Sequence, residues 1–301
     1  MADDDLRECL NRCSGYYAEH HFTEPQVITC KWCGSDNIKK YGVRDGVQEY
    51  FCLDCERKFN IHTKDAPYKK QSPVEQIGAA LDMFYDGLSF ADIARHLDRT
   101  YNNPVVESTV YRWVISYSEI AAKEFESFTP IVSDTWVADE TVLSISGDNI
   151  WLFDIIDERT RFLLATRMSW SRRITDAQQL MESAAKRAGK SPRVVITDKN
   201  NSYLDGIELA FGAGTEHVQS RGFTLQPNTN LIERFHGTVK DRTKVMRDFK
   251  TFESALSIVD GFLVHYNFFR PHMSLSGRTP AEVARINCPF KSWIEFVRSD
   301  R

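Results

Sequence analysis

The stretch of sequence that decides the fold is TWVADETVLSISGDNIWLFDIIDERTRFLLATRM, residues 135–168. It holds three runs rich in β-branched, aromatic and other apolar residues, and two short polar segments separate them. This pattern predicts strands at 136–145, 150–156 and 162–168. Because connections of a few residues join neighbouring antiparallel strands, we expect the three strands to form a meander.

Downstream of the meander the pattern changes to helices that alternate with short strands. In chain order we expect a helix at 175–188 and a buried parallel strand at 194–196. A helix from about 202, a short strand at 217–218 and a long helix from about 230 follow. The resulting order, βββαβαβα, is that of an RNase H-like fold. The sequence therefore predicts an α/β domain with a mixed five-stranded sheet over residues 133–287.

Three acidic residues occupy matching places in these elements. Asp139 lies within the first strand, Asp198 directly follows the buried strand, and Glu233 lies in the first turns of the long helix. In this fold the first and fourth strands are neighbours and the helix after the fifth strand packs across their ends, so the three carboxylates are expected to converge. Oxygen ligands of this kind suit two Mg²⁺ ions about 4 Å apart, for which Mn²⁺ can substitute. The alternative is that each acid is an ordinary surface residue.

The long helix carries cations beyond its acid. Lys240, Lys244 and Arg247 follow Glu233 at intervals that place all four on one side of the helix. This side is predicted to bind a DNA backbone that leads into the metal site. A charged face that is simply solvated is the alternative.

Four cysteines give an independent signal near the N-terminus. Cys30-x-x-Cys33 and Cys52-x-x-Cys55 are separated by 18 residues, a spacing typical of a structural zinc site, and predict a zinc ribbon over 30–65. Four unrelated buried or disulfide-bonded cysteines are the alternative. Lys39 and Lys40 lie among aromatic residues of the ribbon and are predicted to contact DNA, unless those aromatic residues form the core of the ribbon itself.

Residues 72–126 read as three short helices, the first two joined by a tight turn at Gly87. Ser72, Ser89 and Ser108 are expected to cap them. The arrangement predicts a helix-turn-helix, with DNA-binding residues near the start of the third helix at Ser108, Thr109, Tyr111 and Arg112. Because this segment is acidic overall, a plain three-helix bundle is the alternative.

Composition limits the remaining possibilities. The 301 residues are 42% hydrophobic and 27% charged, with a net charge of −4, and no run of 18 apolar residues predicts a transmembrane helix. The acidic start differs from a signal peptide, so a cytoplasmic protein is expected. An acidic leader at 1–29 has no assigned role, and 288–301 is predicted to be a C-terminal tail.

Several short motifs resemble those of one family. They are Val137-Ala138-Asp139-Glu140-Thr141, Ile196-Thr197-Asp198-Lys199, Asn230-x-x-Glu233-Arg234 with Lys240, Tyr266 to His272, and Gly277 to Glu282. Together they resemble the catalytic and tail motifs of DDE transposases of prokaryotic insertion sequences, and of the related integrase core. The 34 residues between Asp198 and Glu233 match the spacing usual there. His236 stands where many relatives have Asn, and the leader has no counterpart.

The resemblance implies a transposase that binds the terminal inverted repeats of a mobile element and catalyses metal-dependent DNA cleavage and strand transfer. It implies that Asp139, Asp198 and Glu233 are the catalytic metal ligands and that Lys240 contacts phosphate. It further implies a homodimer or higher oligomer on DNA, acting on a target DNA in the nucleoid of a prokaryotic cell.

Two other functions are compatible with parts of the sequence. One is a DNA-binding regulator whose RNase H-like domain is inactive, although the presence of all three acids argues against it. The other is a tyrosine recombinase that uses Tyr266 with Arg270 and His272, forms a covalent link to DNA and needs no metal.

Overall fold

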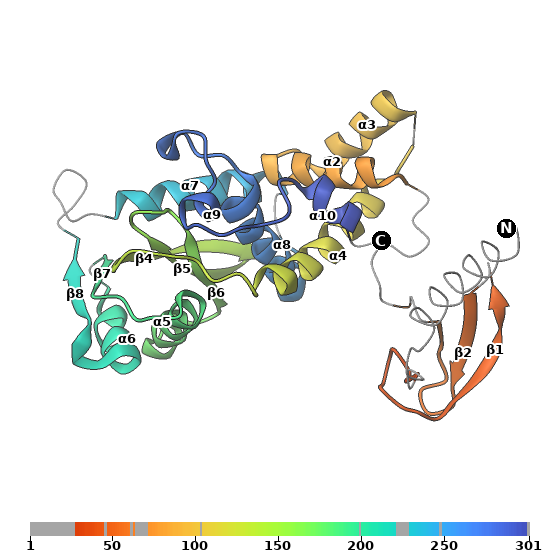
Figure 1. Cartoon of the computed structure of the whole chain (residues 1–301), viewed down its shortest axis with the longest axis horizontal. Helices are drawn as coiled ribbons and strands as arrows, with labels where there is room; N and C mark the ends of the chain where they lie inside the picture. The colour runs from red at the N-terminus through yellow and green to blue at the C-terminus, as the bar shows by residue number, and fades with distance from the viewer. Residues whose placement is uncertain are drawn as a thin grey trace, which may run out of the picture. The chain divides into compact units, whose positions relative to one another are not determined.

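The computed structural model describes residues 28–44, 47–60, 63, 72–102, 104–198, 200–220, 229–246 and 249–299 (Figure 1). The predicted DNA contact Arg247 and nearly all of the predicted leader lie outside these ranges. The chain divides into two compact units, Met1–Tyr68 and Lys69–Arg301.

The first unit contains the predicted zinc ribbon. Its three antiparallel strands are β1 (Ile38–Arg44), β2 (Val47–Cys52) and β3 (Lys58–Asn60), in that order across the sheet. Tyr50 on β2 stacks on Phe59 of β3 at 5.5 Å, and both rings are buried. So small a core gives little stability by itself, which is why a bound metal would matter to this unit.

The second unit is built on a five-stranded sheet, formed in chain order by β4 (Thr135–Ile145), β5 (Asp148–Asp157), β6 (Leu163–Ser169), β7 (Val194–Thr197) and β8 (Glu216–Gln219). The spatial order is β6-β5-β4-β7-β8. The first three strands pair antiparallel, whereas β7 runs parallel to both β4 and β8. This mixed topology confirms the predicted RNase H-like fold.

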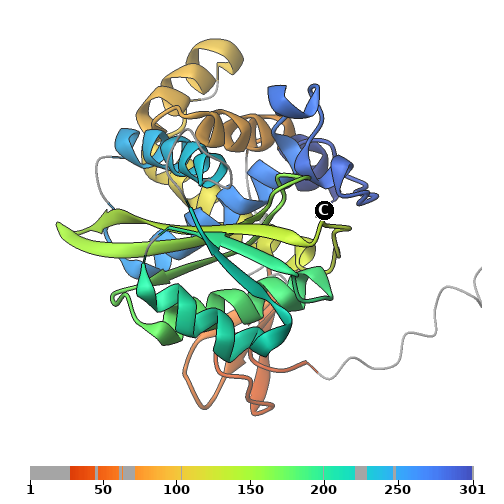
Figure 2. The ribbon, with the colours of Figure 1, turned by 90° about the vertical axis from the view of Figure 1, so that its left-hand side faces the viewer.

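Helices cover both faces of this sheet (Figure 2). One face carries α5 (Ile174–Ala188) and α6 (Asn201–Phe211), and the other carries α7 (Asn230–Val245) and α8 (Phe252–Val264). The remaining helices are α2 (Val74–Asp86), α3 (Phe90–Tyr101), α4 (Glu107–Phe125), α9 (Pro280–Val283) and α10 (Trp293–Ser299). Within the described ranges, none of the helices combines the length and apolarity needed to cross a membrane.

The three predicted helices of the helix-turn-helix are α2, α3 and α4. Ser89 caps α3 as expected, because its Oγ accepts a hydrogen bond from the backbone N–H of Asp92 at 3.1 Å. The other two caps differ from the prediction, since α2 begins after Pro73 and α4 after Val106, without a side-chain cap. These helices belong to the same compact unit as the sheet.

The segment predicted as a tail instead contributes to the core of the second unit. Helix α10 packs against α2, where Trp293 is fully buried and stacks on Tyr85 at 5.3 Å. A Cβ on Gly78 would lie 2.5 Å from the backbone of Ile294, so only glycine allows the two helices to approach this closely. The apolar positions of 293–297 are the signal for this helix that the sequence reading missed.

The motif from Tyr266 to His272 has a structural role in this fold. It begins in a turn of π-helix, His265–Phe269, in which Asn267 is fully buried. The Asn267 side-chain amide donates to the carbonyl of Leu163 at 2.9 Å, and its Oδ1 accepts from the N–H of the same residue at 2.8 Å. It therefore completes the hydrogen bonding of the edge strand β6. Tyr266 is itself buried, which raises its pKa and does not favour a role as a nucleophile on DNA.

Substituting Asn267 with Ala should destabilise the second unit, because the Leu163 N–H and C=O would both be buried without partners. We expect the free energy of unfolding to fall by about 2–4 kcal/mol. Urea denaturation of the variant measures this, with Asn149→Ala, an exposed position near the start of β5, as the matched control. A loss below about 1 kcal/mol in Asn267→Ala would contradict this role.

Asp82 on α2 should make stability depend on pH. Burial, with a contribution from nearby Asp86, raises the pKa of Asp82 from 3.8 to about 7. Because the folded state holds this proton more tightly than the unfolded state, stability is lost as pH rises from the unfolded pKa towards the folded one. Asp82→Asn should therefore raise Tm by about 2–5 °C at pH 8 and by less at pH 5. Thermal melts at both pH values, with exposed Asp98→Asn as control, test this; equal gains at both pH values would exclude it.

Candidate metal centre

Parallel pairing of β4 and β7 brings two of the predicted acids together. The register pairs Val137 with Ile196, so Asp139 on β4 comes level with Asp198, which directly follows β7. One carboxylate oxygen from each of these two residues and one from Glu140 all lie within 4.8 Å of one another. We call Asp139, Glu140 and Asp198 the acidic trio.

Glu140 is the member of the trio that the sequence reading missed. Successive residues on a strand face opposite sides of the sheet, so a neighbour of Asp139 was not expected at the same site. The Glu140 side chain, only 2% exposed, forms an ion pair with Arg172 and accepts a hydrogen bond from Asn200 Nδ2 at 3.1 Å. Burial, with nearby Asp198, raises its pKa. The sequence feature from which this role could have been predicted is the adjacent pair Asp139-Glu140 in the motif at 137–141.

Glu233, the third predicted acid, is half-buried in the first turn of α7 and is not part of the trio. Its Oε1 accepts a hydrogen bond from Thr229 Oγ1 at 2.8 Å. One turn further along α7, His236 Nδ1 lies 3.5 Å from Asp139 Oδ2. The helix that carries Glu233 is therefore held against the strand that carries Asp139.

His236 contacts a second acid as well. Its Nε2 lies 3.0 Å from Oδ2 of Asp154, a fully buried residue that pairs directly with Asp139 across β5 and β4. Burial alone would lower the pKa of His236, but the hydrogen bonds to Asp139 and Asp154 outweigh this effect and raise it to about 9.

The chemistry of the trio fits hard divalent cations. All of its donor atoms are carboxylate oxygens, which Mg²⁺ and Mn²⁺ prefer. The Glu140 Oε2 atom is buried and has no hydrogen-bond partner among the described residues. Three carboxylates this close repel one another unless positive charge balances them. Arg172, which also lies 3.9 Å from Asp198 Oδ2, supplies part of that charge.

The cations predicted to contact DNA on α7 are accessible where the structure describes them. Lys240 and Lys244 are both exposed on the helix that carries Glu233. Their role in binding DNA stays a prediction.

At the start of α4, Ser108, Tyr111 and Arg112 are exposed, and Thr109 is half-buried. The Arg112 guanidinium donates to the Ser108 carbonyl and to Thr109 Oγ1, each at 3.1 Å, so the side chain lies along the first turn of the helix. The four predicted contacts therefore lie together on the first turns of one helix.

The four cysteines of the ribbon fit a structural zinc ion. Their sulfur atoms all lie within 4.8 Å of one another, and the Cys30–Cys55 and Cys33–Cys52 Sγ distances are both 3.6 Å. A zinc tetrahedron with Zn–S bonds of about 2.3 Å has sulfurs about 3.8 Å apart. Both predicted lysines of the ribbon, Lys39 and Lys40, are exposed on β1.

Comparison with known proteins identifies a similar domain and similar transposases. Residues 133–272 match the DDE domain family. The transposase for the insertion sequence-like element IS431mec of Staphylococcus aureus is 28% identical to the chain over 204 residues, which cover 64% of this chain and 84% of the relative. These two matches support a DDE transposase of the kind found in prokaryotic insertion sequences. A further relative of this transposase, with the same identity and coverage, is that of insertion sequence element IS257 in transposon Tn4003 of Staphylococcus aureus.

Solved structures similar to this transposase include two retroviral integrase cores. One is the catalytic core domain of HTLV-2 integrase in complex with magnesium, with a TM-score of 0.41 and 18% identity, covering 52% of this chain and 97% of that one. The other is the catalytic core domain of BIV integrase, with a TM-score of 0.39 and 18% identity, covering 51% and 94%.

Replacing Cys30 with Ser should remove the zinc ion, because three remaining thiolates do not close the tetrahedron. We expect the zinc content of the full-length protein, measured by plasma mass spectrometry, to fall from about one ion per chain to nearly none. Cys288→Ser is the matched control, since Cys288 lies in the second unit. A Cys30→Ser variant that keeps its zinc would exclude the four-cysteine site.

Proposed function

We propose that this transposase cuts and joins DNA at the terminal inverted repeats of a mobile element, with Asp139, Asp198 and Glu233 as the catalytic metal ligands. Two Mg²⁺ ions, or Mn²⁺ in their place, would be held by these carboxylates. The observation that carries the proposal is the meeting of Asp139 and Asp198 from neighbouring parallel strands in an all-oxygen group. His236 adds support, since it ties the helix of Glu233 to Asp139.

Paired divalent ions, when bound, activate the attacking hydroxyl and neutralise the leaving oxygen of a phosphodiester. The chain orients its own carboxylates for this task. The backbone N–H of Asn200 donates to Asp198 Oδ1 at 2.9 Å, which fixes the rotation of that carboxylate. Asn200 Nδ2 donates to Glu140 Oε1 and so holds that side chain as well. The other oxygen, Glu140 Oε2, has no hydrogen-bond partner among the described residues. A water or a DNA 3′-hydroxyl is then the nucleophile, so no covalent protein intermediate is required.

The DNA would be bound by several surfaces of the chain. Lys240 and Lys244, with Arg247 next along the sequence, would contact the backbone near the cleavage site. The start of α4 would read the terminal repeats through Ser108, Thr109, Tyr111 and Arg112. Lys39 and Lys40 of the ribbon would add phosphate contacts.

Joining two element ends to one target DNA requires two active sites close together, so we infer a homodimer or higher oligomer on DNA. Such a complex would act in the cytoplasm, at the nucleoid. A regulator with an inactive core has no observation in its favour among the described residues, because the acids of this core are present and two of them converge.

Asp139→Asn, Asp198→Asn and Glu233→Gln should each reduce strand transfer by at least about 1,000-fold, equivalent to about 4 kcal/mol of transition-state stabilisation. The assay would use a duplex that carries the ends of the element encoding this chain, with Mg²⁺ or Mn²⁺. DNA binding, measured by gel shift, should stay within about threefold of wild type, since each change removes at most one charge.

Asp205→Asn is the matched control, because Asp205 is exposed on α6. Near-normal strand transfer by any of the three variants would remove that residue from the catalytic set. Strand transfer that survives a chelator would refute metal dependence as a whole.

A further inference from the structure

His236 lies between two acids on neighbouring strands. Its Nδ1 is 3.5 Å from Asp139 Oδ2, and its Nε2 is 3.0 Å from Asp154 Oδ2. Asp139 and Asp154 are direct partners in the β4–β5 register, so their side chains project from the same face of the sheet towards α7. One imidazole ring therefore bridges an acid of the trio and an acid outside it.

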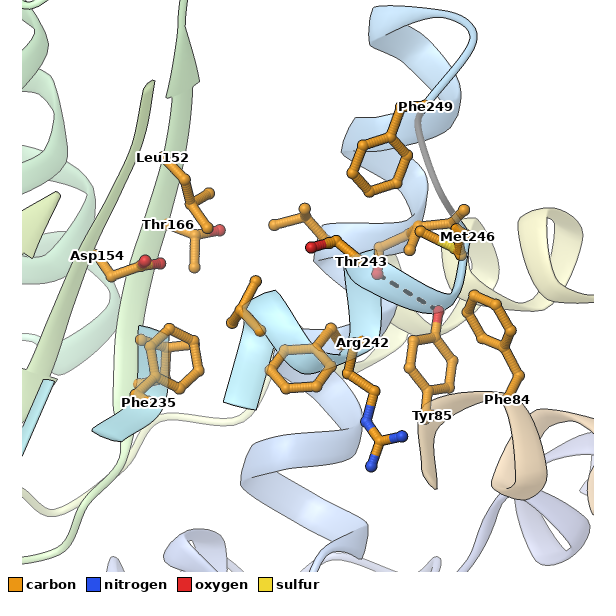
Figure 3. A pocket seen from close by; sticks show the side chains of 15 residues that line it. Phe84, Tyr85, Leu152, Asp154, Thr166, Phe235, Arg242, Thr243, Met246 and Phe249 are labelled. Carbon is orange, nitrogen blue, oxygen red and sulfur yellow. Dashed lines mark hydrogen bonds between the residues drawn. The ribbon is translucent and has the colours of Figure 1, made fainter. Parts of the chain in front are cut away.

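Asp154 is in a costly environment for a carboxylate. It is fully buried, and it lines a cavity of about 20 Å³ together with apolar side chains of the sheet and of α7 (Figure 3). Figure 3 shows Asp154 beside Phe235 and Leu152. Its Oδ1 has no hydrogen-bond partner among the described residues. A buried carboxylate costs several kcal/mol unless it is paired, and His236 is the partner that compensates for it.

Asp139 depends on the same histidine. His236 contacts the Asp139 carboxylate, which could otherwise rotate about the two torsions of its side chain. His236 is only 5% exposed and packs beneath the strands, so it has little access to a DNA substrate. His236 therefore contacts the metal site from the protein interior and not from the side open to substrate.

We propose that Asp154 and His236 form a positioning pair, which holds the Asp139 carboxylate in the rotamer that faces Asp198. This inference rests on the proposed function, because it assumes that Asp139 is a metal ligand. Asp154 fixes the ring of His236, and His236 fixes Asp139. Because His236 follows Glu233 by one turn, the same pair also fixes the helix that carries the third predicted ligand.

The chemistry of the pair determines which substitutions separate positioning from packing. His236→Asn gives up the contact to Asp154, but it keeps an amide N–H near the position of Nδ1 and can still donate to Asp139, whereas His236→Leu fills a similar volume without a donor. Asp154→Asn keeps an acceptor for His236, whereas Asp154→Leu removes it and adds methyl groups beside an apolar cavity.

The test is Mn²⁺ binding to the full-length, zinc-loaded protein, measured by calorimetry. We expect His236→Leu and Asp154→Leu to weaken Mn²⁺ binding by about 10-fold or more, and their asparagine counterparts to stay within about threefold of wild type. Asp157→Asn is the matched control: Asp157 is also fully buried on β5, but it accepts hydrogen bonds from Ser133 and Thr160. That variant should lower Tm while keeping the Mn²⁺ affinity.

Two results would overturn the inference. Leucine variants that remain folded by circular dichroism and bind Mn²⁺ like wild type would remove the positioning role, and so would leucine and asparagine variants that weaken binding equally. Asp139→Asn separates this failure from that of the proposed function. If Asp139→Asn loses Mn²⁺ binding while both leucine variants keep it, only the pair is refuted; if Asp139→Asn binds Mn²⁺ normally, the metal site itself is refuted.

Discussion

The parallel pairing of β4 with β7 is the constraint on which the site depends. Asp139 and Asp198 are 59 positions apart in the sequence, and the register of these two strands sets them level. A slip of one residue would turn one of these carboxylates to the opposite face of the sheet. The register is specified by the buried apolar residues of both strands, such as Val137 and Ile196, so the packing of the core fixes the position of the chemistry.

This register brings several carboxylates together, and their negative charge is balanced by different partners on the two faces of the sheet. On the face covered by α5 and α6, Glu140 is partnered by Arg172 and Asn200. On the face covered by α7, Asp139 and Asp154 share His236. Each face of the sheet thus supplies its own partners for the buried acids. The carboxylate oxygens of the trio remain suited to a divalent cation.

Much of the fold could be predicted because its signals are local. The strand-forming runs and the short turns between them predicted the sheet correctly, and the cysteine spacing predicted the ribbon correctly. The misses at the metal site and at the C-terminal helix depend on tertiary contacts between segments far apart in the sequence. Glu140 joins the trio through a long side chain that overrides strand alternation, His236 acquires its partners only when β5 lies beside β4, and α10 is stable because α2 covers it.

The packing of α10 on α2 joins residues about two hundred positions apart in the second unit. During synthesis, α2 therefore emerges from the ribosome long before the helix that covers Tyr85. Until Trp293 arrives, this apolar surface is open to water, and a chain interrupted in that interval would be a substrate for chaperones and cellular proteases. The helices ahead of the sheet thus reach their final packing only after the sheet itself has been made.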